Sequence, residues 1–321
     1  MTRIDSANNK RNAEMELNEN SRPSLLHRLP LTRIKLLAAR VIYRALRLVL
    51  RDDRRRIRRK GINYEVDLSE GIDLSLFVFG GFQDHVTKSK NFSVKSDAII
   101  LDVGANIGAM SLRFAQQTPA GHVYAFEPTA YAYQKLLRNL SLNPELAARI
   151  TPVQAFCSDR SRASDNLVAY SSWKIDGSAA GAHPLHGGSM HSTEGAEVFT
   201  LDEFCQARQI SAVDLIKIDT DGHELQVLRG ARETLARFRP RIIFEAGLYA
   251  MAENDSSFEQ FADYLSSFGY TLISSRTGHE ITRQNYGAEI PLRSTIDIVA
   301  VPPAPRDARD GSRDQVGDSA R

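Results

Sequence analysis

The sequence has little cysteine and no long apolar run, and each shortage excludes a class of protein. Only Cys157 and Cys205 occur in 321 residues, so no disulfide framework is expected and a reducing compartment fits. No uncharged stretch of 18 or more apolar residues is present, so no membrane-spanning helix is expected. The first 22 residues are polar and do not resemble a secretory signal. Together these features predict a cytoplasmic protein.

Two phosphate-binding motifs are also missing. No G-K-[ST] follows a glycine-rich loop, so a Walker loop is absent. The turn from Gly104 to Gly108 departs from the dinucleotide fingerprint G-x-G-x-x-G, because Asn106 replaces the central glycine. Asp102 precedes this turn, and a carboxylate there would repel a pyrophosphate. A ligand with a positive group and hydroxyls would suit the turn better.

The charge of the chain is unevenly distributed. Residues 28–60 hold 13 Lys or Arg against two Asp, so the rest of the chain sums to −9 although the net charge is +2. Residues 24–60 are predicted to form a basic amphipathic helix. Its basic face would carry Arg40, Arg44, Arg47 and Arg51. Its apolar face would carry Leu37, Val41 and Leu48.

Two roles for this helix remain open. Residues 28–60 are suited to peripheral contact with an anionic membrane surface. Packing on the main domain or on a dimer partner explains the same amphipathic pattern, which is usual for surface helices. Nucleic acid is not an expected partner, since no aromatic residues are interleaved with the basic run.

Strand and helix patterns alternate from Ala98 onward. This alternation predicts an α/β domain of Rossmann-like architecture, with a mostly parallel sheet and helices on both faces. The last two strand patterns, 270–275 and 294–302, have no helix between them, which predicts an antiparallel strand at one edge. The main domain is predicted over 61–301, between disordered ends at 1–23 and 302–321. An irregular insertion, 161–198, is too long for a simple connection and is therefore expected to be functional or mobile.

Acidic residues stand at the ends of the predicted strands. Five strands end this way: at Asp102, Glu127, Asp159, Asp219 and Glu245. Open parallel sheets bind ligands beyond the carboxyl ends of their strands. One or two acids would be expected as caps of the following helices, whereas five favour a binding site.

The spacing of these acids predicts the ligand. Glu127 follows Asp102 by 25 residues, and an acid about 20 residues beyond a glycine turn binds the two hydroxyls of a ribose. A ribose combined with a cationic amino-acid end describes S-adenosylmethionine. Asp159 is the candidate to accept a hydrogen bond from its adenine amino group.

Six segments occur in this order along the chain: DVGANIG, VYAFEP, LLRNLSLN, TLDEF, DLIKIDTDGHELQVLRGA and PRIIFE. Together they resemble the FkbM family of S-adenosylmethionine-dependent methyltransferases. The resemblance runs from about Tyr64 to Pro302 and implies a seven-stranded sheet with the cofactor at its first two strand ends. The implied cofactor-binding residues are Asp102, Gly104, Asn106, Gly108, Glu127 and Asp159. One departure is Asp221, where the family commonly has glutamate.

The expected reaction is O-methylation of a small molecule or a glycan. Because the sulfonium is an activated donor, the protein needs mainly to align donor and acceptor and to remove the acceptor proton. The candidate bases are Asp219, which is alternatively a helix cap, and His223, which is alternatively a surface residue. The spacing of Asp219, Asp221 and His223 does not converge on a metal, so no metal site is expected.

The predicted insertion, 161–198, holds further candidate residues for the acceptor site. Four residues of this segment would line the acceptor site or form a lid: His183, His186, His191 and Trp173. Alternatively, the histidines are ordinary polar loop residues and the tryptophan is a local apolar anchor.

Two alternative functions remain. An NAD-dependent oxidoreductase is one, and Asn106 argues against it. A non-catalytic, membrane-associated module is another, and the intact acids argue against it.

Overall fold

The computed structural model describes residues 31–81, 83, 94–161, 168–175, 188–193 and 195–303. Side chains of residues 31–36, 168–173, 188–190 and 192 are not described. The predicted disordered segment 1–23, nearly all of the predicted tail, His183 and His186 lie outside these residues. The same holds for the side chain of Trp173.

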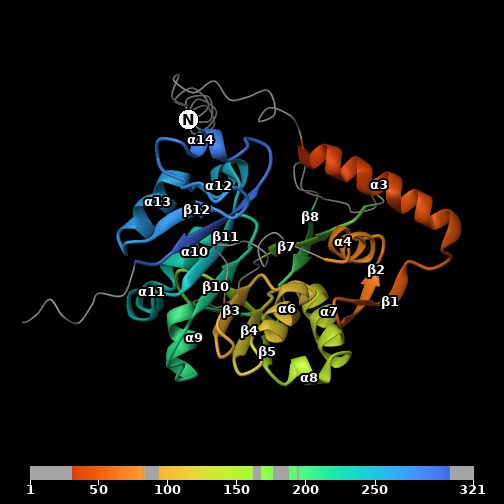
Figure 1. The fold of residues 1–321 in the computed structure, drawn as a ribbon, viewed down its shortest axis with the longest axis horizontal. Helices are drawn as coiled ribbons and strands as arrows, with labels where there is room; N and C mark the ends of the chain where they lie inside the picture. Colours follow the sequence, from red (N-terminus) through yellow and green to blue (C-terminus); the bar gives the residue numbers. More distant parts are fainter. Residues whose placement is uncertain are drawn as a thin grey trace, which may run out of the picture.

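Seven strands form the central sheet (Figure 1). Their order is β12 (Thr271–Ser274), β13 (Ile296–Val301), β11 (Arg241–Ala246), β10 (Leu215–Ile218), β3 (Ile99–Val103), β4 (His122–Phe126) and β5 (Ile150–Val153). All neighbours are parallel except where β13 pairs with β11 and with β12. The predicted α/β class with a mostly parallel sheet is therefore confirmed.

The position of the antiparallel strand differs from the prediction. It was expected at an edge, but β13 lies between β11 and β12, and the edge strand β12 runs parallel to the others. The physical reason is apolarity: Ile298, Val299 and Ala300 of β13 are completely buried. A strand that is buried on both faces is most stable inside the sheet, where both of its edges are hydrogen-bonded.

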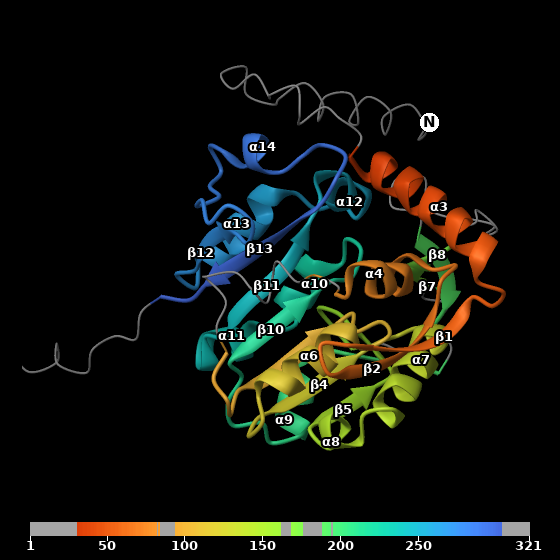
Figure 2. The same ribbon diagram turned by 45° about the vertical axis from the view of Figure 1, so that its right-hand side comes forward.

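Helices cover both faces of the sheet (Figures 1 and 2), and two hydrophobic cores lie between helices and sheet. Along β3, Leu101 and Val103 enter one core and Ile100 the other, as the alternation of a strand requires. The first core is covered by α9 (Leu201–Ala207), α10 (Glu224–Arg229), α11 (Arg232–Phe238), α12 (Leu248–Glu253) and α13 (Phe258–Ser266). The second is covered by α4 (Gly71–Phe79), α6 (Ala109–Gln117), α7 (Ala130–Ser141) and α8 (Pro144–Ala147). A short helix, α14 (Tyr286–Glu289), precedes β13.

The basic N-terminal segment is a helix followed by a hairpin, which corrects the prediction of one helix over 24–60. Helix α3 is described over Leu31–Val49, and β1 (Arg54–Arg59) pairs antiparallel with β2 (Ile62–Asp67). Lys60 and Gly61 both have positive φ, 51° and 84°. Two such residues make the tight turn that matches strand twist, so the chain folds back as a hairpin here.

One apolar face of α3 packs on the domain, and a second is exposed. The side chains toward the second core are Ala39, Ile42, Tyr43 and Leu46. Those of the predicted apolar face are exposed: Leu37, Val41 and Leu48. The helix therefore packs on the domain while it presents apolar residues outward. Within the described part of the chain, no helix has the length and apolarity needed to cross a bilayer.

The region predicted as an irregular insertion contains strands of its own. β7 (Val168–Trp173) and β8 (Gly188–Ser192) pair antiparallel, while β6 (Ala155–Cys157) pairs parallel with β9 (Glu197–Phe199). The predicted third strand is thus divided, because β5 stays in the central sheet and β6 leaves it. Just after β7, Ile175 donates its N–H to the carbonyl of Ser69 at 2.8 Å and is fully buried.

Candidate active site

The glycine turn joins β3 to α6 and lies against the end of β10. The N–H groups of Gly104 and Ala105 donate to the Phe126 carbonyl at 3.0 and 2.9 Å. Gly104 has φ 76°, and a Cβ built on it would lie 1.8 Å from the carbonyl oxygen of Asp219. The missing side chain at Gly104 is therefore required by the neighbouring strand end. Gly108, also at positive φ, precedes the first residue of α6.

Glu127 lies directly beside this turn. Its Oε2 accepts the N–H of Asn106 at 3.0 Å, and its Oε1 accepts the N–H and Oγ of Thr129 at 2.9 and 2.5 Å. Asn106 has φ 49°, a left-handed conformation that asparagine tolerates. Glu127 is only 4% exposed, and burial raises its pKa despite these hydrogen bonds. A buried carboxylate thus sits next to the turn, as the spacing predicted.

Asp102 is paired with a buried lysine that was not predicted. The two residues are neighbours across β3 and β10, and Lys217 Nζ lies 3.4 Å from Asp102 Oδ1. Ser111 Oγ donates to Asp102 Oδ2 at 2.5 Å. Lys217 also donates to the Gly104 carbonyl at 2.9 Å. Asp102 is 0% exposed, so its carboxylate faces the protein's own cation.

Lys217 also faces Asp219. The distance from Nζ to Asp219 Oδ2 is 3.4 Å, and the same oxygen accepts Nε2 of Gln83 at 3.0 Å. Burial alone would lower the pKa of Lys217, but Asp219 and Asp102 outweigh it and raise the pKa to about 12. Lys217 therefore stays charged and holds two carboxylates of adjacent strand ends near each other.

Three further acids stand close to Asp219 and make this edge strongly acidic. Burial, followed by repulsion from Asp219 and Glu224, raises the pKa of Asp221 to about 8. Burial, followed by Asp219 and Asp221, holds the pKa of Glu245 well above its usual range. Burial also raises the pKa of Glu224, although this residue accepts the N–H groups of Thr220 and Gly222 at 2.9 and 3.1 Å. The positive charge around these acids does not compensate for them.

His223 lies at the start of α10. It is the residue that precedes the first helical residue, Glu224. Its ring packs edge-on against Phe156 at 5.5 Å between centroids. Burial lowers the pKa of His223, so the imidazole is neutral at pH 7. Burial is thus the main cause of this neutrality. Among the described residues, no group of three or more His, Cys, Asp or Glu is arranged to hold a metal ion.

Asp159 is not brought to the glycine turn by any contact in the described part of the chain. It follows β6, outside the central sheet, and its Oδ1 lies 3.4 Å from Arg160 Nε and from Ser158 Oγ. Its role toward an adenine ring stays a prediction.

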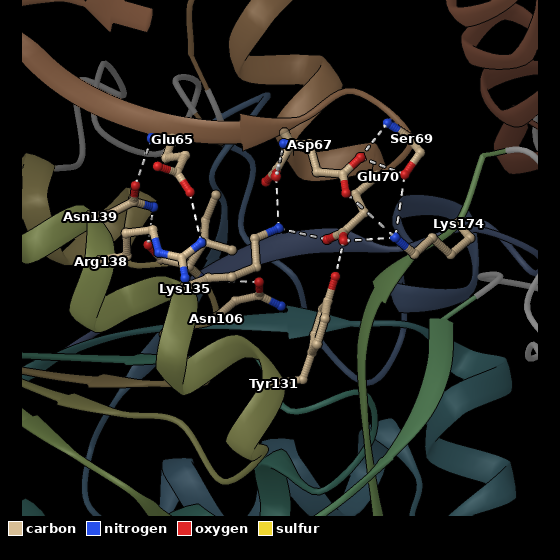
Figure 3. Close-up of polar contacts among 12 residues, drawn as sticks. Glu65, Asp67, Ser69, Glu70, Asn106, Tyr131, Lys135, Arg138, Asn139 and Lys174 are labelled. Carbon is tan, nitrogen blue, oxygen red and sulfur yellow. Dashed lines mark hydrogen bonds and ion pairs between the residues drawn. The ribbon is translucent and has the colours of Figure 1, made fainter. Parts of the chain in front are cut away.

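A second buried charge cluster, drawn in Figure 3, was not predicted from the sequence. Glu70 is 0% exposed and lies 2.8 Å from Lys135 Nζ and 3.0 Å from Lys174 Nζ. Tyr131 donates its hydroxyl to Glu70, and Lys135 also contacts Asp73 at 2.7 Å. These residues come from α4, its preceding turn, α7 and the insertion, and are far apart in the sequence. No local motif signals such a cluster.

The insertion is fastened at this second cluster. Lys174 belongs to it, and His191 of β8 stacks on Tyr131 with ring centroids 4.6 Å apart. The predicted acceptor-site role of His191 stays a prediction, since the contact shown is to the protein's own tyrosine. Burial lowers the pKa of His191.

Comparison with known proteins finds similarity to methyltransferases. The family model described as the methyltransferase FkbM domain matches residues 102–272. The 2-O-methyltransferase NoeI of Sinorhizobium fredii is 27% identical over 160 residues, which are 45% of this chain and 62% of that protein. The hexuronic acid methyltransferase AglP of Haloferax volcanii is 26% identical over 144 residues, 44% of this chain and 53% of that protein.

A solved structure is also similar. The methyltransferase FkbM from Methylobacillus flagellatus shares 18% identity, with a TM-score of 0.44, over 67% of this chain and 47% of that one. Each of these three matches spans less than two thirds of the other protein's length.

Proposed function

Because this chain belongs to the FkbM methyltransferase family, we propose that it is an S-adenosylmethionine-dependent methyltransferase that acts on a hydroxyl group of a small molecule or a glycan. The observation that carries the proposal is the position of Glu127. Its carboxylate is bonded to the N–H of Asn106 in the glycine turn, so turn and acid form one surface at the ends of β3 and β4.

The residues present fit the nucleoside part of the cofactor. Oε1 of Glu127 already accepts two hydrogen bonds from Thr129, whereas Oε2 accepts one from Asn106 and can accept one more. Burial raises the pKa of Glu127, so a ribose hydroxyl that donated to Oε2 would relieve part of the cost of its burial. Asn106, Gly104 and Gly108 provide the turn against which the nucleoside would lie.

The residues present also fit a positively charged group. Burial, followed by the negative charge of Asp219, keeps the pKa of Asp221 and that of Glu245 high. A cationic ligand near these acids would lower both pKa values and gain binding energy from them. We therefore assign the positive end of the cofactor to this cluster. Asp102 supports it indirectly, through Lys217.

The bound cofactor would supply an activated methyl group, and the protein would supply alignment and proton removal. Asp219 and His223 are the two candidates to accept the acceptor's proton. His223 is neutral at pH 7 and half-buried, and so able to take a proton. Asp219 is already paired with Lys217, which Asp102 also contacts, so we favour His223 as the base.

The name of one relative favours an oxygen acceptor, and that of another favours a carbohydrate. One is a 2-O-methyltransferase and another a hexuronic acid methyltransferase. An oxygen of a sugar is therefore the acceptor we propose first. No structural observation favours the oxidoreductase alternative.

Calorimetry with S-adenosylhomocysteine tests the cofactor assignment. The full chain is expected to bind it, and Glu127→Gln is expected to weaken binding about tenfold or more through loss of charge-assisted hydrogen bonds. Glu145→Gln, at an exposed position on α8, is the matched control and should bind normally. Mass spectrometry of glycans incubated with protein and S-adenosylmethionine should then show a gain of one methylene. Binding of NAD in place of the nucleoside would contradict the proposal.

A further inference from the structure

Helix α3 has two apolar faces, and the described part of the chain covers one of them. The outer face is exposed by 62% at Leu37, 59% at Val41 and 89% at Leu48. Val49, at the end of the helix, is 80% exposed. Four of the eight strongly exposed large apolar side chains in the described residues lie on this one helix. Scattered exposed leucines are ordinary, but a row along one helix marks an interaction surface.

The orientation of α3 is fixed by polar contacts. Asp53 lies 3.0 Å from Arg47 Nη1 and accepts the Tyr43 hydroxyl at 3.2 Å, which ties the end of the helix to the hairpin. Arg40 Nε donates to the carbonyl of the fully buried Ile175 at 3.2 Å. The helix lies along the margin of the molecule in both views (Figures 1 and 2). Its outer face is therefore a fixed feature of the fold.

Positive charge surrounds this apolar row. Arg44 stands within it, between Val41 and Leu48, and is exposed. Arg51 follows the helix, and the outward face of β1 carries Arg54, Arg56 and Arg58. Residues 37–60 include ten basic and two acidic side chains, whereas the chain outside 28–60 sums to −9. Such a charge asymmetry orients a protein with its basic side toward an anionic surface.

We propose that the outer face of α3, together with the basic face of β1, binds the surface of a membrane that contains anionic phospholipids. Apolar side chains mixed with arginines suit the boundary between lipid headgroups and acyl chains. The apolar side chains would enter the acyl region, and the arginines would contact the lipid phosphates. A second copy of this chain fits less well. A two-fold contact through this face would place arginines of one copy against arginines of the other, which is repulsive. The binding is independent of methyl transfer.

Vesicle flotation of the full chain tests the proposal. Vesicles of phosphatidylcholine alone are compared with vesicles of equal parts phosphatidylcholine and phosphatidylglycerol. The protein is expected to float with the anionic vesicles, to bind neutral ones far more weakly, and to be released by high salt. Bound and free fractions across lipid concentrations give the partition coefficient.

Two sets of variants separate the apolar from the charged contribution. The triple variant Leu37→Gln, Val41→Gln, Leu48→Gln is expected to lower partitioning at least about tenfold. Leu292→Gln, at another exposed leucine, is its control. The pair Arg44→Gln, Arg51→Gln is expected to lower partitioning by about tenfold. The pair Arg229→Gln, Arg232→Gln removes the same charge from α10 and α11 and should change little. All these positions are exposed, so folding should be preserved, and circular dichroism checks it.

Each outcome decides the question. Anionic-selective flotation that both outer-face variants abolish supports the proposal. Failure of the full chain to float overturns it. A dimer in analytical ultracentrifugation that the triple variant dissociates, without vesicle binding, would identify a second copy as the occupant instead. Flotation that begins only after removal of residues 1–30 would assign the face to that segment and would also overturn the proposal.

Discussion

Two buried charge clusters of this protein differ in their balance of charge. Around Glu70, burial would raise the carboxylate's pKa, but Lys135, Tyr131 and Lys174 outweigh it and hold the pKa below its usual range. Around Asp219, the pKa values of Asp221 and Glu245 are raised. The first cluster therefore pairs most of its acids, whereas the second has acids in excess.

This difference separates a structural role from a binding role. A paired cluster such as that of Glu70 joins three segments and needs nothing further. An acid-rich cluster costs stability when it is empty and regains free energy when a cation binds. The balance of charge, rather than burial alone, thus distinguishes the candidate active site from the internal support beneath the insertion.

The largest effect is expected from removing the lysine of the acid-rich cluster. Lys217→Met leaves Asp102 buried without its cation and should destabilise the protein by about 3–5 kcal/mol. Urea denaturation measures the change. Lys95→Met is the control, because Lys95 is largely exposed and lies 3.7 Å from Asp214, so its loss should cost little. Equal, small losses in both variants would contradict this account of Lys217.

The next effect concerns catalysis at the same edge. His223→Gln is expected to lower kcat about a hundredfold, within the range for loss of a general base, with little change in stability. Because burial lowers the pKa of His223, the acid limb of the pH–rate profile should lie below the ordinary imidazole range. The variant should lose this limb. His279→Gln, at an exposed histidine, should leave both kcat and the limb intact. An unchanged profile in His223→Gln would leave Asp219 as the base.

A smaller effect is expected from the paired cluster. Lys135→Met should cost about 2 kcal/mol, since Glu70 keeps Lys174 and Tyr131 while Asp73 loses the ammonium that faces it. Burial raises the pKa of Asp73 to about 6. The loss should therefore be smaller at pH 5, where Asp73 is protonated, than at pH 8. Denaturation at both pH values measures it.

Lys135→Met also sharpens the comparison between the two clusters. Calorimetry should show that this variant still binds S-adenosylhomocysteine, since Lys135 contacts none of the acids at the ends of β10 and β11. Loss of binding without loss of stability would make the Glu70 cluster part of the binding site and remove the distinction.

The fold and the family could be predicted because their signals are local. The six motifs predicted the family, and the family model confirms it. Alternating strand and helix patterns predicted the sheet, and the spacing of Asn106 and Glu127 placed both at one edge. These features depend on residues close together in the sequence, or on strand ends that any parallel sheet brings together.

The remainder depends on contacts between distant segments. Lys217 looked like one residue of a buried strand, and only the register of β3 and β10 places it beside Asp102. Glu70 meets Lys135 and Lys174 from 65 and 104 residues away. The sequence predicted the apolar face of α3 and left open what it contacts; Leu37, Val41 and Leu48 of that face are not covered by the domain. Sequence periodicity gives a helix its faces without saying which one is buried.

The smallest change in stability is expected when one negative charge is removed from the acid-rich cluster. Asp221 has a pKa raised to about 8, so the folded state binds more protons than the unfolded state between about pH 4 and pH 8. Stability must fall as the pH rises through this window. Asp221→Asn removes the titration and should stabilise the protein by about 1–2 kcal/mol at pH 8.5, after allowance for solvent screening, with little gain at pH 4. Thermal unfolding across the pH range measures it.

The backbone at Asp221 supplies a matched control for this gain. Asp221 and Asp255 both have left-handed φ, 53° and 50°, which asparagine tolerates well. Asp255 is exposed, so Asp255→Asn should show the backbone effect alone, constant with pH. If the two variants gain the same stability at every pH, the negative charge of Asp221 does not destabilise the protein. If Asp221→Asn gains stability and also binds S-adenosylhomocysteine or S-adenosylmethionine less tightly, the acid-rich edge trades stability for binding.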